Sequence, residues 1–344
     1  MPVAREKAYD GSRVTFSLLL FPNYAEKIPL STVSVIVLNH NTRDLLEACL
    51  RSVESEGSGL SPAYAGVEVV VVDNGSSDGS AAMVRTAFPG VRLIAHDCNT
   101  GFARGNNAGI RATTSPYILL LNSDARLRPG ALGAMVAFME AHPDAGIAGP
   151  QVLNADGSLQ LSCGIPPTVW TEVCNKLLLH VPFPFFKMGG WAHDAAEEVG
   201  WVTGACLLAR RTMLDRVGLL DEGMFMYYED LDLCFRARRA GWKVCYVPAG
   251  KAVHLGGGTS RHVFGPMLIA SGRSSFYFFR KHYGDGAVRL LRLVTLAEMA
   301  LRSALWGMLG VFSSRRRREA RERLRAYRTI LWRTLTDRSY WRAA

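Results

Sequence analysis

The sequence lacks the glycine-rich loops that most often hold phosphates in proteins. No G-x-G-x-x-G opens a helix after the first expected strand, and no G-x-x-x-x-G-K-[S/T] occurs in the chain. The first loop is typical of dinucleotide-binding dehydrogenases and the second of P-loop NTPases. The sequence therefore disfavours both classes, and any bound phosphate would have to be held by a metal ion instead.

Paired cysteines and a long uncharged apolar run near the N-terminus are also missing. The seven cysteines are scattered without a C-x-x-C pair, and most lie in apolar runs. We therefore expect reduced core cysteines in a cytosolic protein. The apolar segment Val14–Phe21 is too short to span a bilayer, and no small-residue cleavage site follows it. We expect it to form an extra strand or a docking segment.

Acidic residues are fewer than basic ones: the chain has 30 Asp and Glu and 40 Lys and Arg, which gives a net charge of +10. Much of the excess follows Arg289 and includes Arg315–Arg318. The apolar stretch 287–312 is long enough to span a bilayer but carries Arg292, Glu298 and Arg302. Each charge at the centre of a spanning helix costs about 2.5–3.5 kcal/mol. We therefore expect an amphipathic helix on an anionic membrane surface.

A basic tail of this kind has two other possible uses. The alternative to membrane contact is packing on its own domain or on a second subunit, which leaves a homodimer open. Nucleic acid is not expected as a partner, because the basic residues accompany no recognisable reader motif.

What is present is a regular alternation of strand-like and helix-like segments in a chain of 344 residues. Short apolar runs separated by helical segments predict right-handed parallel βαβ units, and hence an α/β fold. The expected strands are Val33–Leu38, Val67–Val72, Val91–Ala95, Ile118–Leu121, a strand near Ile147, Trp201–Leu208 and Trp242–Val247. The expected helices are Thr42–Val53, Ser80–Phe88, Ala103–Ala112, Gly130–His142, Arg211–Val217 and Glu229–Gly241.

Three of these strands end directly in polar, turn-prone residues. The three ends are Asn39-His40-Asn41, Asp73-Asn74-Gly75 and Asn122-Ser123-Asp124. Any one of them can be a cap or a turn, but the carboxyl ends of parallel strands meet at the edge where ligands bind. We therefore predict a nucleotide pocket there. Asp73 can accept a hydrogen bond from the imide of uracil or thymine, and the carboxylate of Asp124 suits Mg²⁺ or Mn²⁺ beside a diphosphate.

A second group of candidate residues lies late in the chain. Glu229 and Asp230 begin a helix whose acids precede its arginines, an order that the helix dipole explains without any chemistry. The aromatic residues just before them, Phe225, Tyr227 and Tyr228, are not explained in this way. Carboxylates beside aromatic side chains suit a general base on a sugar-binding surface.

Two single residues and one long insertion complete the candidates. Gly204 lies inside an expected strand, where a ligand or another backbone can approach closely. His254 lies in an expected loop, before glycines and hydroxyls at 256–260 that can wrap a metal diphosphate. The irregular segment Gln151–Glu198 is expected to help form an acceptor site.

Taken together, six motifs resemble those of a known family. They are V-I-V-L-N-H-N, V-V-D-N-G-S-S-D-G-S, N-T-G-F-A-R-G-N-N-A-G, L-N-S-D-A, M-Y-Y-E-D-L-D-L-C-F-R and V-H-L-G-G-G-T-S, between Val33 and Arg261. The chain resembles the family 2 inverting glycosyltransferases of GT-A fold, and most closely their rhamnosyltransferase-like branch. That resemblance implies a Rossmann-like, mostly parallel sheet flanked by helices and followed by a basic helical extension.

The resemblance also implies a division of the chain and a role for each candidate. We expect an N-terminal extension (1–30), a nucleotide-sugar-binding half (31–150), an acceptor and catalytic half (151–265) and an amphipathic, Arg-rich helical region (266–344). Asp124 and His254 would hold the metal, although the first position of the D-x-D motif is Asn122 here. Asp230 would be the catalytic base, with Glu229 as the competing candidate. The nucleotide-sugar site would comprise Asn39, Asn41, Asp73, Asn74, Gly101, Arg104, Asn106, Asn122, Asp124 and Gly204.

The implied function is sugar transfer in cell-surface polysaccharide synthesis. A Mg²⁺- or Mn²⁺-dependent inverting enzyme would move L-rhamnose from dTDP-rhamnose to a glycan or a polyprenyl-diphosphate-linked acceptor, at the inner face of the cell membrane. A UDP-sugar donor (GlcNAc, Gal or galactofuranose) and a non-catalytic nucleotide-sugar-binding or glycan-binding protein are the alternatives. A sugar nucleotidyltransferase would need a glycine-rich, basic loop after the first strand, where Asn39-His40-Asn41 offers none.

Overall fold

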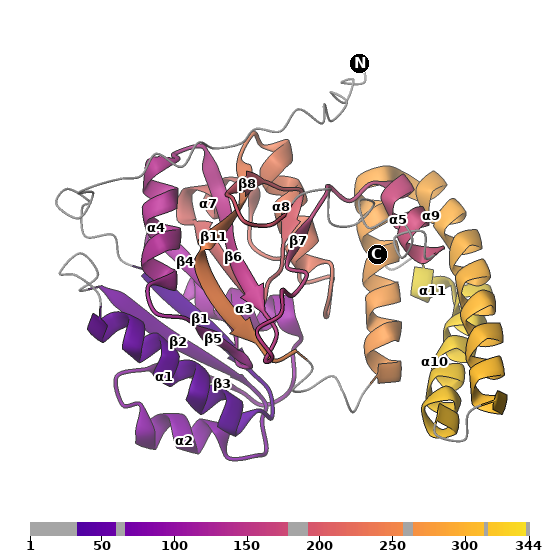
Figure 1. The fold of residues 1–344 in the computed structure, drawn as a ribbon, viewed down its shortest axis with the longest axis horizontal. Coiled ribbons are helices and arrows are strands. Elements are labelled where there is room, and N and C mark those ends of the chain that lie inside the picture. The colour runs from indigo at the N-terminus through magenta and orange to yellow at the C-terminus, as the bar shows by residue number, and fades with distance from the viewer. Residues whose placement is uncertain (1–32, 60–65, 178–191, 257–263, 313–315, 342–344) are drawn as a thin grey trace.

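A computed structural model describes residues 33–59, 66–177, 192–256, 264–312 and 316–341. An α/β body lies beside a bundle of helices from the C-terminal part of the chain (Figure 1). Three sequence-based expectations fall outside the described residues: the segment Val14–Phe21, the part of the insertion at 178–191, and the glycine and hydroxyl loop from 257 onward.

Within the described residues, the main sheet has nine strands in the order β3-β2-β1-β4-β10-β6-β11-β5, with β8 paired to β11. Their bounds are β1 Val33–Asn39, β2 Val67–Asn74, β3 Arg92–His96, β4 Tyr117–Asn122, β5 Ala125–Leu127, β6 Ala145–Leu153, β8 Glu197–Glu198, β10 Cys206–Arg210 and β11 Lys243–His254. The first four of these strands are parallel, whereas β10 runs antiparallel to β4 and β6. The expected α/β sheet flanked by helices is confirmed.

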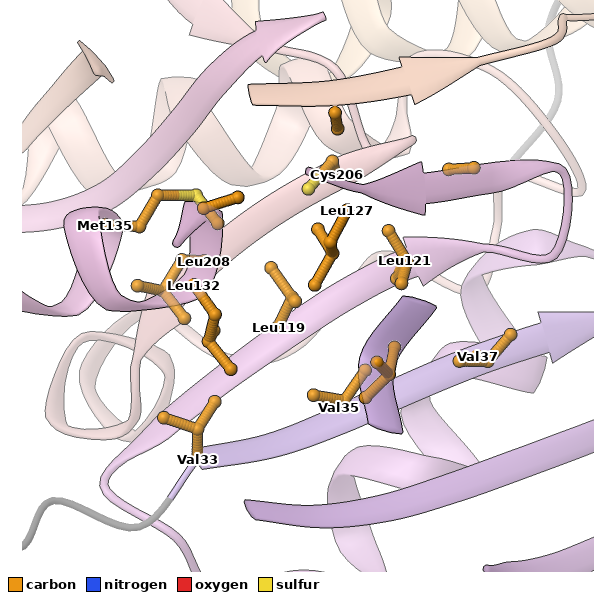
Figure 2. Packing of buried hydrophobic residues seen from close by; sticks show 14 of the residues in the cluster. Val33, Val35, Val37, Leu119, Leu121, Leu127, Leu132, Met135, Cys206 and Leu208 are labelled. Carbon is orange, nitrogen blue, oxygen red and sulfur yellow. The ribbon is translucent and has the colours of Figure 1, made fainter. Parts of the chain in front are cut away.

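Helices cover both faces of this sheet. One face carries α1 (Arg43–Gly59), α2 (Ser80–Ala87) and α4 (Ala131–Ala141), and the other carries α3 (Phe102–Arg111), α7 (Arg211–Val217) and α8 (Glu229–Arg239). Figure 2 shows Val33, Val35 and Val37 of β1 in the first core, near Leu119 and Leu121 of β4. Ile36 of β1 belongs to the opposite core. A strand buried on both faces explains the continuous apolar runs of the sequence.

The strand order places a crevice at the carboxyl ends of β1 and β4. Chain order runs outward from β1 through β2 to β3, and the next strand, β4, pairs on the other side of β1. Ligands bind where the strand order reverses in this way. The register pairs Leu38 with Asn122 and Asn39 with Asp73. The three polar strand ends therefore meet at one edge, as the sequence predicted.

Two expectations for the second half of the chain are wrong. Trp201–Leu208 is not one strand, because β9 (Trp201–Val202) pairs with β7 (Cys163–Gly164) and the chain turns before β10 begins. His254 does not lie in a loop, because β11 continues past an irregularity between Val247 and Lys251 and ends at His254. In both cases pairing with strands distant in sequence decides the backbone path, and local apolar patterns do not contain that information.

The remaining helices form the C-terminal bundle. It contains α9 (Phe264–Phe312), which kinks at Gly284, α10 (Arg317–Thr336) and α11 (Arg338–Trp341), and α5 (Val169–Lys176) packs on it (Figure 1). Its core is separate from those of the sheet and is rich in aromatic residues such as Phe276, Phe278 and Tyr327. The division of the chain at residues 30, 150 and 265 stays a prediction.

Candidate active site

A cavity of about 250 Å³ lies at the carboxyl ends of β1 and β4, between the sheet, the first turn of α8 and the start of α9. It brings together most of the residues predicted from widely separated motifs. Those that line it are Asn74, Gly101, Asn122, Asp124, Gly204, Glu229, Asp230 and His254. Sequence analysis assigned no role to other lining residues. Asn99 and Met226 begin two of its motifs, whereas Thr203 and Met267 belong to none.

Asp124 and His254 lie face to face in this cavity. The Nε2 atom of His254 is 3.2 Å from Oδ1 of Asp124. Antiparallel pairing of β11 with β5 puts His254 opposite Ala125, and the backbone N–H of Leu255 donates to the carbonyl oxygen of Asp124 at 3.0 Å. The two side chains are therefore held together by strand pairing, although 129 residues separate them in sequence.

Gln160 sets the orientation of the His254 ring. The Oε1 atom of Gln160 is 2.7 Å from Nδ1 of His254. The Nε2 group of Gln160 donates to Oδ1 of Asn154 at 2.8 Å and to the backbone oxygen of His254 at 3.2 Å. Because Gln160 presents its oxygen to the ring, it accepts a hydrogen bond from Nδ1–H. In the neutral imidazole, Nε2 then carries the lone pair that a metal ion can use. Nothing in the sequence around Gln160 pointed to this contact.

This pair of side chains fits a divalent cation. A carboxylate oxygen and an imidazole lone pair facing each other are suitable ligands for Mn²⁺ or Mg²⁺, and a second residue that fixes the ring is common at metal-binding histidines. The part of the chain that the structure describes contains no cluster of three or more His, Cys, Asp and Glu side chains suited to a metal. A cation held here would need further oxygen ligands from a substrate.

Three predicted residues stabilise the loops beside the cavity and do not line it. Asn39 donates to Oδ1 of Asp73 at 2.9 Å, and Asp73 also accepts from the backbone N–H of Ser76 at 3.1 Å. Asn41 accepts from the backbone N–H of Ser77 at 2.8 Å and has a positive φ of 53°. The proposed contact of Asp73 with a nucleotide base stays a prediction.

The predicted loop from Gly101 is tied to the segment before α8. Gly101 has φ 90°, and a Cβ atom there would lie 2.6 Å from the backbone oxygen of Phe225, so only glycine fits. Arg104 instead pairs with Glu222 at 3.2 Å and faces a neighbouring cavity. Asn106 is buried and donates to the backbone oxygen of Phe102 at 3.0 Å. Nucleotide-sugar contacts by Arg104 and Asn106 stay predictions.

Asp230 is fixed by two backbone groups. Its Oδ2 atom accepts from the N–H of Gly204 at 2.8 Å and its Oδ1 atom from the N–H of Leu231 at 2.8 Å. Burial raises the pKa of this carboxyl, although both hydrogen bonds act to lower it. A Cβ atom at Gly204 would lie 3.2 Å from the ring of Phe102 and 3.5 Å from Cβ of Asp230, so the close approach expected there is to side chains of the protein itself.

Glu229 differs from Asp230 in its burial and in its hydrogen bonding. Its side chain is 4% exposed, and among the described residues its Oε2 atom has no hydrogen-bond partner. Burial, together with the nearby charge of Asp230, raises the pKa of Glu229 well above its ordinary value. Tyr227 and Tyr228 just before it have positive φ angles of 68° and 69°. Such conformations cost free energy and concentrate at functional sites.

Two family models match the chain. The model described as glycosyl transferase family 2 matches residues 34–180, and the model described as glycosyl transferase family group 2 matches residues 117–335. Together they cover the sheet, the cavity and most of the C-terminal bundle.

Curated relatives cover most of the chain. It is 29% identical over 271 residues to the N-acetylglucosaminyl-diphospho-decaprenol L-rhamnosyltransferase of Mycobacterium tuberculosis, covering 73% of this chain and 87% of the relative. It is 39% identical over 257 residues to the rhamnosyltransferase WbbL of Escherichia coli, covering 72% of this chain and 93% of the relative.

Solved structures share the fold at low identity. The mannosyltransferase PcManGT from Pyrobaculum calidifontis, in complex with GDP-Man and Mn²⁺, matches with a TM-score of 0.54 and 17% identity, over 90% of this chain and 88% of that one. GalNAc-T7 with UDP, GalNAc and Mn²⁺ matches with a TM-score of 0.52 and 16% identity, over 74% of this chain and 50% of that one.

The buried carboxyl of Glu229 predicts a pH-dependent gain in stability when its charge is removed. A raised pKa means that the folded state binds this proton more tightly than the unfolded state, so ionisation at neutral pH destabilises the fold. We expect Glu229→Gln to raise the Tm at pH 7.5, by about 2–4 °C per kcal/mol gained. The gain should vanish as the pH falls toward the ordinary glutamate value of 4.5.

Glu222→Gln is the matched control, because its effect should have the opposite sign. Hydrogen bonds from Asn107 and Arg111 lower the pKa of Glu222, so its charge stabilises the fold above the unfolded-state pKa. Thermal unfolding across pH 4.5–8 distinguishes the two variants. If the Tm of Glu229→Gln at pH 7.5 were equal to or lower than that of the wild type, the prediction would be wrong: the carboxyl of Glu229 would not destabilise the folded state.

Proposed function

The chain belongs to glycosyl transferase family 2 and is a glycosyltransferase of GT-A fold, and we propose that it transfers L-rhamnose from dTDP-rhamnose. The acceptor would be a glycan or a polyprenyl-diphosphate-linked sugar in cell-surface polysaccharide synthesis. The names of both relatives support rhamnose as the transferred sugar, and the name of the M. tuberculosis relative supports an acceptor sugar carried by a lipid diphosphate. The observation that carries the proposal is that Asp124, His254 and Asp230 line one cavity. A UDP-sugar donor is the alternative.

Asp124 and His254 would hold Mg²⁺ or Mn²⁺ in this cavity. Both structural neighbours were solved with Mn²⁺ and a nucleotide or nucleotide sugar, which supports a divalent cation in general. When bound, the cation supplies positive charge for the diphosphate leaving group. Asn122 takes the position of a second carboxylate, and its Nδ2 atom lies 3.5 Å from Nε2 of His254.

Asp230 is the better candidate for the general base. It lines both the cavity that contains Asp124 and His254, here called the donor cavity, and a second cavity next to it, whereas Glu229 lines only the donor cavity. An acceptor hydroxyl arriving from the second cavity can therefore reach Asp230. The carboxylate would take the hydroxyl proton while the oxygen bonds to the anomeric carbon. The bond to the diphosphate breaks in the same displacement, its electron pair leaves with the diphosphate, and the configuration inverts.

The C-terminal bundle would place the enzyme at the inner face of the cell membrane. By length and composition α9 is apolar enough to cross a bilayer. Its second half exposes apolar side chains, with Leu293 66% and Phe312 86% accessible. The following helix, α10, contains the arginines 317, 318, 321, 323, 325, 328 and 333. An apolar face beside cationic side chains suits the surface of an anionic membrane. A homodimer through this bundle stays open.

Nucleotide binding should depend on a divalent cation. In a thermal-shift screen of dTDP, UDP, GDP and ADP, we expect dTDP or UDP to raise the Tm only with Mn²⁺ or Mg²⁺. A ligand at 100 times its Kd stabilises the folded state by about 2.7 kcal/mol. Asp124→Asn and His254→Ala should abolish the metal-dependent shift, whereas His142→Ala, at the residue that caps the C-terminus of α4, should retain it. Absence of a shift with all four nucleotides would argue against the donor site.

Removing the base should stop transfer without affecting the donor site. We expect Asp230→Asn to lower kcat for sugar transfer by about 10²–10⁴-fold, with nucleotide and metal binding unchanged. Only the deprotonated carboxylate of Asp230 can act as the base, and its pKa is raised. As the pH is lowered, kcat of the wild type should therefore begin to fall at a pH above the ordinary pKa of aspartate. Turnover by Asp230→Asn close to the wild-type rate would exclude this carboxylate as the base, and Glu229→Gln would be measured next.

Membrane binding should need both the apolar face and anionic lipid. In sedimentation with vesicles, we expect the wild type to bind anionic phospholipid vesicles more strongly than zwitterionic ones, and less strongly at high salt. Leu293→Glu should reduce binding. Leu159→Glu, at an exposed apolar residue of the α/β body, should not. Equal binding by the two variants would mean that α9 does not contact the membrane.

A further inference from the structure

A second cavity, of about 450 Å³, lies between the α/β body and the C-terminal bundle. Its walls come from α5, Trp201, the first turn of α8, both halves of α9, and Ile330 of α10. Tyr227 and Asp230 line this cavity and the donor cavity as well. Asp230, the proposed base, therefore lies between the two cavities. Asp124 and His254 line only the donor cavity.

The charged side chains at the bundle side of this cavity are mostly half-buried and compensate one another. Lys176 lies 3.5 Å from a carboxylate oxygen of Glu172 and 3.5 Å from one of Glu298. Arg302 donates to Glu298 at 3.0 Å. Two acids and two bases leave no net charge among these four groups. A ligand here meets paired charges, which suits a neutral polar molecule better than a phosphate.

Hydroxyl groups extend this polar wall toward the base. Tyr228 and Ser275 donate to Oε1 of Glu172 at 2.9 and 3.0 Å. Tyr228 is also the residue that directly precedes the first turn of α8. The wall is thus continuous from the bundle to the segment that carries Asp230.

Two buried polar atoms on the wall lack partners. In the described part of the chain, neither Oδ1 of Asn175 nor Oγ1 of Thr295 makes a hydrogen bond. Both residues line the cavity, and Thr295 is only 2% exposed. Buried polar atoms are normally satisfied by protein, ordered water or ligand. The missing partners of these two atoms are therefore expected inside the cavity.

Apolar side chains make up the rest of the wall. Trp201, Leu268 and Met299 contribute large apolar surfaces beside the hydroxyls and amides. A molecule that meets both kinds of surface needs C–H faces as well as hydroxyl groups. Sugars have this combination, and ligand sites of about 300–1,000 Å³ are typical of small molecules.

We propose that this second cavity binds the saccharide end of the acceptor, with Asn175 and Thr295 as hydrogen-bonding partners of its polar groups. The inference rests on the proposed function and adds to it the acceptor's place and class. One acceptor hydroxyl would lie at Asp230, and the sugar ring would extend toward the bundle. The C-terminal helices are then half of the acceptor site, in addition to any contact that they make with a membrane.

The test compares two buried threonines of the bundle. Thr334 is fully buried, and its Oγ1 likewise has no partner in the described residues, but it does not line the cavity. Saturation-transfer NMR and calorimetry would measure the binding of methyl glycosides of glucose, galactose, mannose, rhamnose and N-acetylglucosamine. We expect at least one to bind the wild type. Thr295→Val should weaken its binding about tenfold, and Thr334→Val should leave it unchanged.

A second variant in the same cavity tests whether Thr295→Val weakens saccharide binding only through a change elsewhere in the structure. Ser271 lines the same cavity from the first half of α9, and Ser271→Phe should fill the space and abolish glycoside binding. Loss of saccharide binding in Ser271→Phe and its weakening in Thr295→Val would together support the site. Failure of every glycoside to bind the wild type would identify the cavity as water-filled and overturn the proposal, as would equal effects of the two threonine variants.

Nucleotide binding with Mn²⁺, measured on the same samples, separates this inference from the proposed function. If dTDP or UDP still binds with metal while the cavity variants have no effect, only the acceptor site is wrong. If no nucleotide binds, the donor proposal fails independently of the saccharide result.

Discussion

The buried carboxylate of Asp232 joins the two bodies of the molecule. It is fully buried and lies 2.7 Å from a nitrogen of each of three cationic or polar partners, Arg236 on its own helix and Lys281 and His282 on α9. Burial acts to raise its pKa, but the hydrogen bond from His282 and the charges of Arg236 and Lys281 lower it to about 2. The ionised carboxylate therefore fixes α8 against the bundle, and both cavities lie along this junction.

The position of Asp230 follows from the same constraint. It lies two residues before Asp232 on α8, and the N–H of Gly204 holds its carboxylate from the sheet side. The proposed base is therefore held by the α/β body through Gly204, and its helix is held by the C-terminal bundle through Asp232. The cavity at the ends of β1 and β4 contains Asp124 and His254, the proposed metal ligands, whereas the bundle side of the second cavity has compensated charges. This difference suits a nucleotide diphosphate on one side and a neutral saccharide on the other.

Much of the first half of the fold could be predicted because its signals are local. Apolar runs identified β1, β2 and β4, and the polar residues that end them meet at one edge of the sheet, as expected. The second half could not be predicted equally well. Its strands pair antiparallel with distant partners, as β10 does with β4 and β11 with β5. The pattern of a single strand does not show which partner it will meet, so the break after Val202 was missed.

The sequence alone determined the family, the order of the secondary-structure elements and most of the candidate residues, because motif spacing and hydrophobic periodicity are properties of the chain itself. Only the tertiary structure decided how these residues meet. It placed Gln160 on the ring of His254, left Oε2 of Glu229 without a partner among the described residues and put the C-terminal helices opposite Asp230. Such contacts depend on the packing of segments far apart in the chain, and no local pattern of residues encodes them.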